Sequence, residues 1–95
     1  MINKFIAKPV MVEALQFKGT EESFNEIKVF LDNTFTQGLF ESFEKQAVLK
    51  IIDNTAFFVE IIDLVLNQND YLIKGVYGEY FKLPDLLFNL LYEKS

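Results

Sequence analysis

The chain has 95 residues, a formal net charge of −5, and neither cysteine nor histidine. These features exclude a disulfide framework and the usual zinc ligands, and a chain of this length supports one hydrophobic core rather than two. We therefore expect a single domain over residues 1–95 that folds without a metal ion or a cofactor.

The basic residues are all lysines, nine in number, and they stand against 14 acidic residues. Arginine is the side chain best suited to bidentate contacts with phosphates and base edges, and a negative net field repels nucleic acid. We therefore expect no direct binding to DNA or RNA. Acidic residues such as Glu13, Glu26 and Glu44 are scattered, which favours solvated faces over a mimic of a phosphate backbone.

In chain order, the first predicted element is a strand over residues 10–17, directly after Pro9. Lys4, Lys8 and Pro9 interrupt the apolar residues at the start of the chain. No run there reaches the length of a signal peptide or a membrane span. We therefore expect a cytoplasmic protein without membrane contact.

A helix over about residues 21–32 is predicted next, because apolar residues recur there at helical spacing. Two alternatives exist for its start. Thr20 is one candidate N-cap, and Ser23 with Glu26 at capping-box spacing is the other. The apolar stripe is expected to pack on a sheet.

The middle of the chain alternates short β-favouring runs with turn-forming residues, which predicts a meander of strands. The expected strands cover residues 39–43, 47–52 and 56–62, with a turn at residues 53–55 between the last two. Residues 64–66 are expected to extend the sheet, and residues 67–70 favour a local turn.

Residues 70–81 predict a β-hairpin with Tyr77-Gly78 as a two-residue loop, because glycine supplies the positive φ that such a loop needs. In this register Gly75 lies opposite Tyr80, whose ring would cover the bare glycine backbone. The structural role of this cluster outweighs a ligand-binding role, because cross-strand pairs of this kind are common.

Pro84 suits the first turn of a short helix over about residues 85–92. The apolar side of this helix is expected to consist of Leu86, Leu87, Leu90 and Leu91. The order of elements predicts an α+β fold with an antiparallel-rich sheet, one helix in the N-terminal half and a short C-terminal helix.

Two segments carry a family resemblance. The first is KPVMVEALQF at residues 8–17, and the second combines NDYLIKGVYGEYF at residues 69–81 with PDLLF at residues 84–88. They resemble the two ends of a widespread family of small phage and prophage proteins of unknown function. Gln68-Asn69 and Lys82-Leu83 stand here where that family often has Pro-Gly and Cys-Lys. The resemblance implies a phage-encoded accessory protein with an α+β fold, and no mechanism.

Catalysis has little support in the sequence. Without histidine or cysteine, a nucleophile would depend on hydroxyl, lysine or carboxylate groups, and no Ser-x-x-Lys, Gly-x-Ser-x-Gly or P-loop pattern occurs. Asp63 and Asp70 are both expected at turns, where aspartate is favoured for local hydrogen bonding. No calcium-loop spacing is present either. We therefore expect no enzyme, no catalytic residues and no metal site.

The favoured hypothesis is a non-enzymatic interaction protein that binds a protein partner or itself through an aromatic patch or an exposed sheet edge. The 11 phenylalanines either fill one aromatic core or leave some rings at the surface for a partner. A homodimer is the expected form, because sheet edges and exposed rings need covering and two-fold contacts are the commonest solution.

Two other hypotheses remain open. The chain could be an acidic inhibitor of a nucleic-acid-binding protein, such as an anti-phage defence protein. It could also bind a small nucleotide-like ligand, in which case aromatic rings would stack on the ligand and lysines would counter its charge. The candidate ligand- or partner-binding residues are Tyr71, Lys74, Tyr77, Tyr80 and Lys82.

Overall fold

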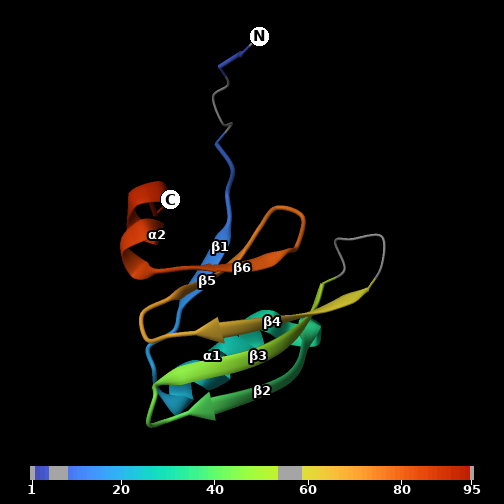
Figure 1. Ribbon diagram of the computed structural model, residues 1–95, viewed down its shortest axis with the longest axis vertical. Coiled ribbons are helices and arrows are strands. Elements are labelled where there is room, and N and C mark those ends of the chain that lie inside the picture. Colours follow the sequence, from blue (N-terminus) through green and yellow to red (C-terminus); the bar gives the residue numbers. More distant parts are fainter. Residues whose placement is uncertain (1, 5–8, 54–58, 95) are drawn as a thin grey trace.

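The computed structural model describes residues 2–4, 9–53 and 59–94 (Figure 1). Its elements in chain order are β1 (Glu13–Gln16), α1 (Glu21–Leu31), the 3-10 turn η1 (Asp32–Thr34), β2 (Phe35–Glu41), β3 (Gln46–Asp53), β4 (Glu60–Leu66), β5 (Tyr71–Lys74), β6 (Tyr80–Leu83) and α2 (Asp85–Leu91). The described strands form two three-stranded antiparallel sheets, β1-β5-β6 and β2-β3-β4. The predicted α+β fold is confirmed, with its strands divided between two sheets.

The two sheets meet where β4 runs beside β6. A side chain makes a hydrogen bond across this junction, because the Lys82 ammonium donates to the Val65 carbonyl. The same ammonium lies 3.9 Å from the Asp70 carboxylate. Lys82 of β6 therefore contacts both β4 and the turn that follows β4, in which Asp70 lies.

α1 confirms the predicted helix and selects between the two proposed caps. The Thr20 hydroxyl accepts the Ser23 N–H at 3.1 Å, so Thr20 is the N-cap. The Ser23 hydroxyl is buried and accepts the Lys18 N–H at 2.8 Å. The helix ends at Leu31, because Asp32 has a φ of 53° and cannot continue it.

The core lies between α1 and the β2-β3-β4 sheet (Figure 1). Alternation along β3 turns Ala47, Leu49 and Ile51 to one face, where each is fully buried. They belong to the same apolar cluster as Ile27 and Leu31 of α1. The apolar stripe of the helix therefore packs on a sheet, as its spacing predicts.

Several strand boundaries differ from the predicted ones. β1 covers only Glu13–Gln16 of the predicted residues 10–17, because its pairing with β5 begins at Glu13 opposite Lys74. β2 begins at Phe35, four residues before the predicted start, and it contains a register shift between Phe35 and Gln37. Residues 54–58, which include most of one predicted turn and the start of the next strand, lie outside the described residues.

β5 and β6 form the predicted hairpin, but its loop is one residue longer. The Gly75 N–H donates to the Glu79 carbonyl at 2.8 Å, which leaves Val76-Tyr77-Gly78 as a three-residue loop. Gly78 has the predicted positive φ, 84°, because three-residue loops also close through a left-handed residue. The Glu79 carboxylate, not the Tyr80 ring, covers the backbone of Gly75.

The two aspartates weighed as acid–base candidates have different surroundings. Asp70 lies in the predicted turn, where its carboxylate accepts the Asn67 N–H at 2.8 Å. The prediction of a turn at Asp63 is wrong: this residue lies within β4, where its carboxylate oxygen is 2.9 Å from the Lys50 ammonium on β3. The strand continues through it because Lys50 is its cross-strand partner.

Candidate functional site

The structure brings only part of the predicted site together. Lys74, Tyr77 and Tyr80 line a small pocket of about 220 Å³ beside η1. Tyr71 lies on the opposite face of β5 from Lys74, because side chains three residues apart in a strand point to opposite faces. Lys82 lies at the junction with β4, where it contacts the Val65 carbonyl.

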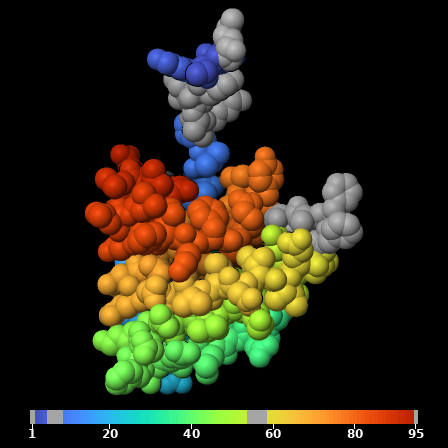
Figure 2. All heavy atoms as spheres, in the orientation of Figure 1, coloured from blue at the N-terminus to red at the C-terminus, as the bar shows by residue number. Residues whose placement is uncertain are grey.

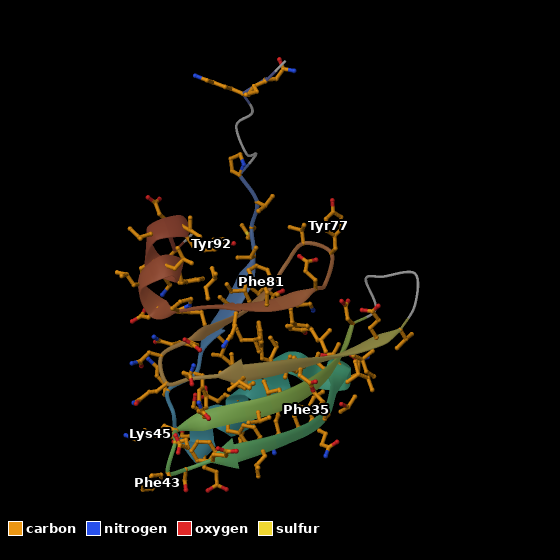
Figure 3. All side chains as sticks on the ribbon, viewed as in Figure 1. Phe35, Phe43, Lys45, Tyr77, Phe81 and Tyr92 are labelled. Carbon is orange, nitrogen blue, oxygen red and sulfur yellow. The ribbon has the colours of Figure 1, made fainter. Side chains whose placement is uncertain are left out.

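The small pocket is poorly suited to an anionic ligand. Tyr80 is buried, its ring packs edge-on against Phe30, and its hydroxyl donates to the Phe30 carbonyl at 3.4 Å. Tyr77 is exposed at the tip of the hairpin loop (Figure 3). Asp32 forms part of the same pocket wall as Lys74 and brings a charge of opposite sign to it. Tyr80 is thus already packed in the core. The charges of Lys74 and Asp32 cancel, so the pocket does not favour a phosphate.

A stack of three aromatic rings lies on the other side of the β1-β5-β6 sheet. Tyr71 of β5 stacks on Phe88 of α2, with ring centroids 3.8 Å apart and an interplanar angle of 12°. Phe88 stacks in turn on Tyr92, at 5.1 Å and 24°. Residues 88 and 92 are one helical turn apart, so they present their rings on one side of α2. This stack is what docks α2 on the sheet.

The docking of Phe88 turns the leucines of α2 toward solvent. Leu86 and Leu90 are 77% and 74% exposed, and Leu87 and Leu91 are also exposed. The four leucines predicted to form the apolar side of this helix are therefore not the residues that pack on the sheet. The physical reason is that Phe88 contacts Tyr71, while Leu86, Leu87 and Leu90 lie on other sides of the same helix.

The residues before β1 continue away from the sheet, and we call residues 9–12 the arm. Figure 2 shows α2 (red) and the arm (blue) at the same end of the molecule. Val10 and Met11 of the arm are exposed, Met11 by 77%. An open groove of about 820 Å³ separates the arm from α2, and Phe88, Asn89 and Tyr92 contribute its helical wall.

We call the exposed apolar residues of the arm and of α2 together the α2–arm surface. Two of its members, Val10 and Met11, line the groove, and the other four, which do not, are Leu86, Leu87, Leu90 and Leu91. Glu93 and Lys94 line the groove as well and add one charge of each sign. Sequence reasoning found Tyr71 but missed Phe88 and Tyr92, although their spacing of four residues on a predicted helix was a usable signal.

A second apolar surface covers the outer face of the β2-β3-β4 sheet. Leu39 and Ile61 are exposed there, on either side of the ion pair between Lys50 and Asp63. The charged pair divides this face, whereas residues 86–91 of α2 include no charged residue. The phenylalanines contribute little to either surface. Among the phenylalanines that the structure describes, only Phe43, in the β2–β3 turn, is exposed (Figure 3).

The described residues offer little for chemistry. Within residues 2–4, 9–53 and 59–94, no three acidic side chains gather closely enough to hold a metal ion. In the same ranges, no helix combines the length and apolar character needed to cross a membrane. Comparisons with protein-family models, with curated proteins and with solved structures find no match to this chain.

Proposed function

We propose that the chain is a non-enzymatic accessory protein of a phage or prophage, which acts in the host cytoplasm by associating with a protein partner or with another copy of itself. The observation that carries this proposal is the row of exposed leucines on α2, which no other described element covers. The phage origin rests on the resemblance of residues 8–17 and 69–88 to that family.

The exposure of the α2 leucines supports association. Leu86, Leu87, Leu90 and Leu91 are 40–77% exposed on one short helix, and an exposed apolar patch rimmed by polar residues often marks an interaction site. A helix that served only to cover the β1-β5-β6 sheet would need one apolar stripe, and Phe88 and Tyr92 already provide it. The leucines are therefore available to a partner.

Capture from phage-infected or lysogenic cells, with the purified chain as bait, tests this proposal. Leu90→Glu introduces a charge among the exposed leucines of α2 and should abolish partner recovery. Leu39→Glu makes the same change on the outer face of the β2-β3-β4 sheet and should leave recovery unchanged. Equal recovery by both variants and the unaltered chain would contradict the proposal.

The salt dependence of the captured complex separates association through apolar contacts from acidic inhibition. A partner held through leucines should resist moderate salt, because hydrophobic contacts are not screened. A nucleic-acid-binding protein that is released steeply as ionic strength rises would instead support the acidic inhibitor.

A small-ligand function has one specific observation in its favour, the pocket that unites Lys74 with Tyr77 and Tyr80. A thermal-shift series with nucleoside mono-, di- and triphosphates tests it, and Lys74→Met is the matched variant. Stabilisation by one nucleotide that disappears in Lys74→Met would place this function ahead of association. We favour association, because Asp32 shares the pocket wall and Tyr80 is already used by the core.

A further inference from the structure

We propose that the small pocket beside η1 binds a free α-amino acid with an apolar side chain. In this complex the Lys74 ammonium binds the carboxylate of the ligand, and the Asp32 carboxylate binds its ammonium group. The lining of the pocket contains no residue of α2, so the inference goes beyond the proposed association and does not depend on it.

The pocket contains two opposite charges that are not paired with each other. Lys74 is the last residue of β5, Asp32 is the first residue of η1, and both line the pocket. Among the residues that the structure describes, no ion pair and no side-chain hydrogen bond involves either of them. The ammonium and the carboxylate therefore lie beyond ion-pair distance of each other although they share one pocket. A small molecule that carries both charges can bind to both groups at once.

The surroundings keep both charged groups available to a ligand. The Glu79 carboxylate, which could otherwise pair with Lys74, accepts the Tyr77 N–H at 3.2 Å and lies against the backbone of Gly75. Asp32 is exposed, and its φ of 53° and ψ of −129° are rare for a residue other than glycine. Backbone conformations of this kind cost free energy and are concentrated at binding sites.

The volume of the pocket sets the size of the ligand. It is about 220 Å³, whereas sites for drug-sized ligands have roughly 300–1,000 Å³. At about 30 Å³ for each water molecule, the pocket has room for roughly seven waters. Valine and leucine have a similar number of non-hydrogen atoms, whereas a nucleotide is far larger. The pocket therefore suits a single free amino acid.

The uncharged part of the lining favours an apolar side chain on the ligand. Leu31 and Ile52 line the pocket together with the charged residues, and the Tyr77 ring stands exposed at the tip of the hairpin loop (Figure 3). An apolar side chain gains free energy when it is buried against such residues. A charged side chain would instead bring a third charge, for which the two matched charges of the pocket leave no partner.

Three compounds, L-leucine, leucinamide and N-acetyl-leucine, test whether the pocket binds both charges. Leucinamide lacks the carboxylate and N-acetyl-leucine lacks the ammonium group, so each derivative loses one contact. Calorimetric titration at millimolar ligand should show that leucine binds and that each derivative binds about tenfold more weakly or less. Either derivative binding as well as leucine would overturn the inference, because a free amino acid would then not be the preferred ligand.

Two substitutions assign the contacts to residues. Lys74→Met and Asp32→Asn should each weaken leucine binding by about tenfold or more. In Lys74→Met, leucine and leucinamide should bind equally, because the partner of the carboxylate is gone. In Asp32→Asn, leucine and N-acetyl-leucine should bind equally for the matching reason. Lys18→Met and Asp63→Asn make the same changes outside the pocket and should bind leucine like the unaltered chain.

The remaining outcomes also decide the inference. Unchanged leucine binding in both Lys74→Met and Asp32→Asn would show that leucine binds elsewhere and would overturn it. A nucleoside phosphate that binds more tightly than leucine would overturn the choice of ligand, and so would the absence of binding by every apolar amino acid. Circular dichroism checks the fold of each variant, and the derivatives test the unaltered chain if a variant fails to fold. None of these results bears on capture through the α2 leucines, because they do not line the pocket.

Discussion

Replacing Phe88 by alanine is expected to release α2 from the sheet. The Phe88 ring makes both stacking contacts of the helix, to Tyr71 and to Tyr92. Truncating a partly buried phenylalanine and losing its stacking contacts costs about 3–4 kcal/mol. This corresponds to a shift of roughly 100- to 1,000-fold in the equilibrium between docked and undocked α2. Seven residues cannot sustain a helix alone, so undocked α2 should also unfold.

Hydrogen exchange of single amides measures this local opening. The Tyr92 N–H donates to the Phe88 carbonyl at 2.9 Å and reports on α2, while the Leu49 amide in β3 reports on the core. In Phe88→Ala the Tyr92 amide should lose its protection and the Leu49 amide should keep most of it, because the core cluster contains no residue of α2.

Tyr71→Phe is the matched control for this prediction. It removes one hydroxyl and keeps the stacked ring, so the protection of the Tyr92 amide should hardly change. An unchanged Tyr92 amide in Phe88→Ala would show that the ring stack does not hold α2. Equal losses at Tyr92 and Leu49 would show that α2 unfolds only together with the core.

The remaining stability predictions concern the turns, a cap and a surface pair, and urea denaturation measures each. Gly78→Ala should cost about 1–2 kcal/mol, because Gly78 has a positive φ, while the added Cβ would meet no other atom. Gly19 also has a positive φ, and its added Cβ would lie 2.9 Å from the Gln68 side chain, so Gly19→Ala should cost about 1–3 kcal/mol more than Gly78→Ala. Adding Gln68→Ala should recover most of that difference, and equal costs at the two glycines would refute the reasoning. Thr20→Ala should lose about 1 kcal/mol with its cap bond, and no loss would mean that the cap is dispensable. Asp63→Asn should change stability by less than about 0.5 kcal/mol, because its ion pair is exposed to solvent, and a larger loss would contradict this.

Local signals explain what the sequence predicted well. α1 has a hydroxyl cap at Thr20 and apolar residues on one stripe, so its start and its buried face both follow from residues close in sequence. Gly78 needs a positive φ in any short hairpin loop, so its conformation was predictable. The loop length was not, because two- and three-residue loops both accept glycine at that position.

Contacts between residues that are far apart in the sequence explain what the sequence did not predict. β1 is shorter than its apolar run, because its partner strand ends at Lys74 and leaves the arm unpaired. Residues 86–92 are apolar at six of seven positions, so the pattern does not say which stripe faces the sheet. The answer depends on Tyr71, which lies far away in sequence and stacks on Phe88.

The contact between Phe88 and Tyr71 also links the stability of α2 to association. α2 is short and is held mainly through one ring, while its leucines gain nothing from the isolated fold. A second copy that covers these leucines binds only the docked helix, so by mass action it must stabilise docking. The protection of the Tyr92 amide should therefore rise with chain concentration, while that of the Leu49 amide should not. In Leu90→Glu the concentration dependence should disappear although the helix stays docked through Phe88. If the protection of Tyr92 is independent of concentration in a chain that light scattering identifies as dimeric, the dimer forms through a surface other than α2.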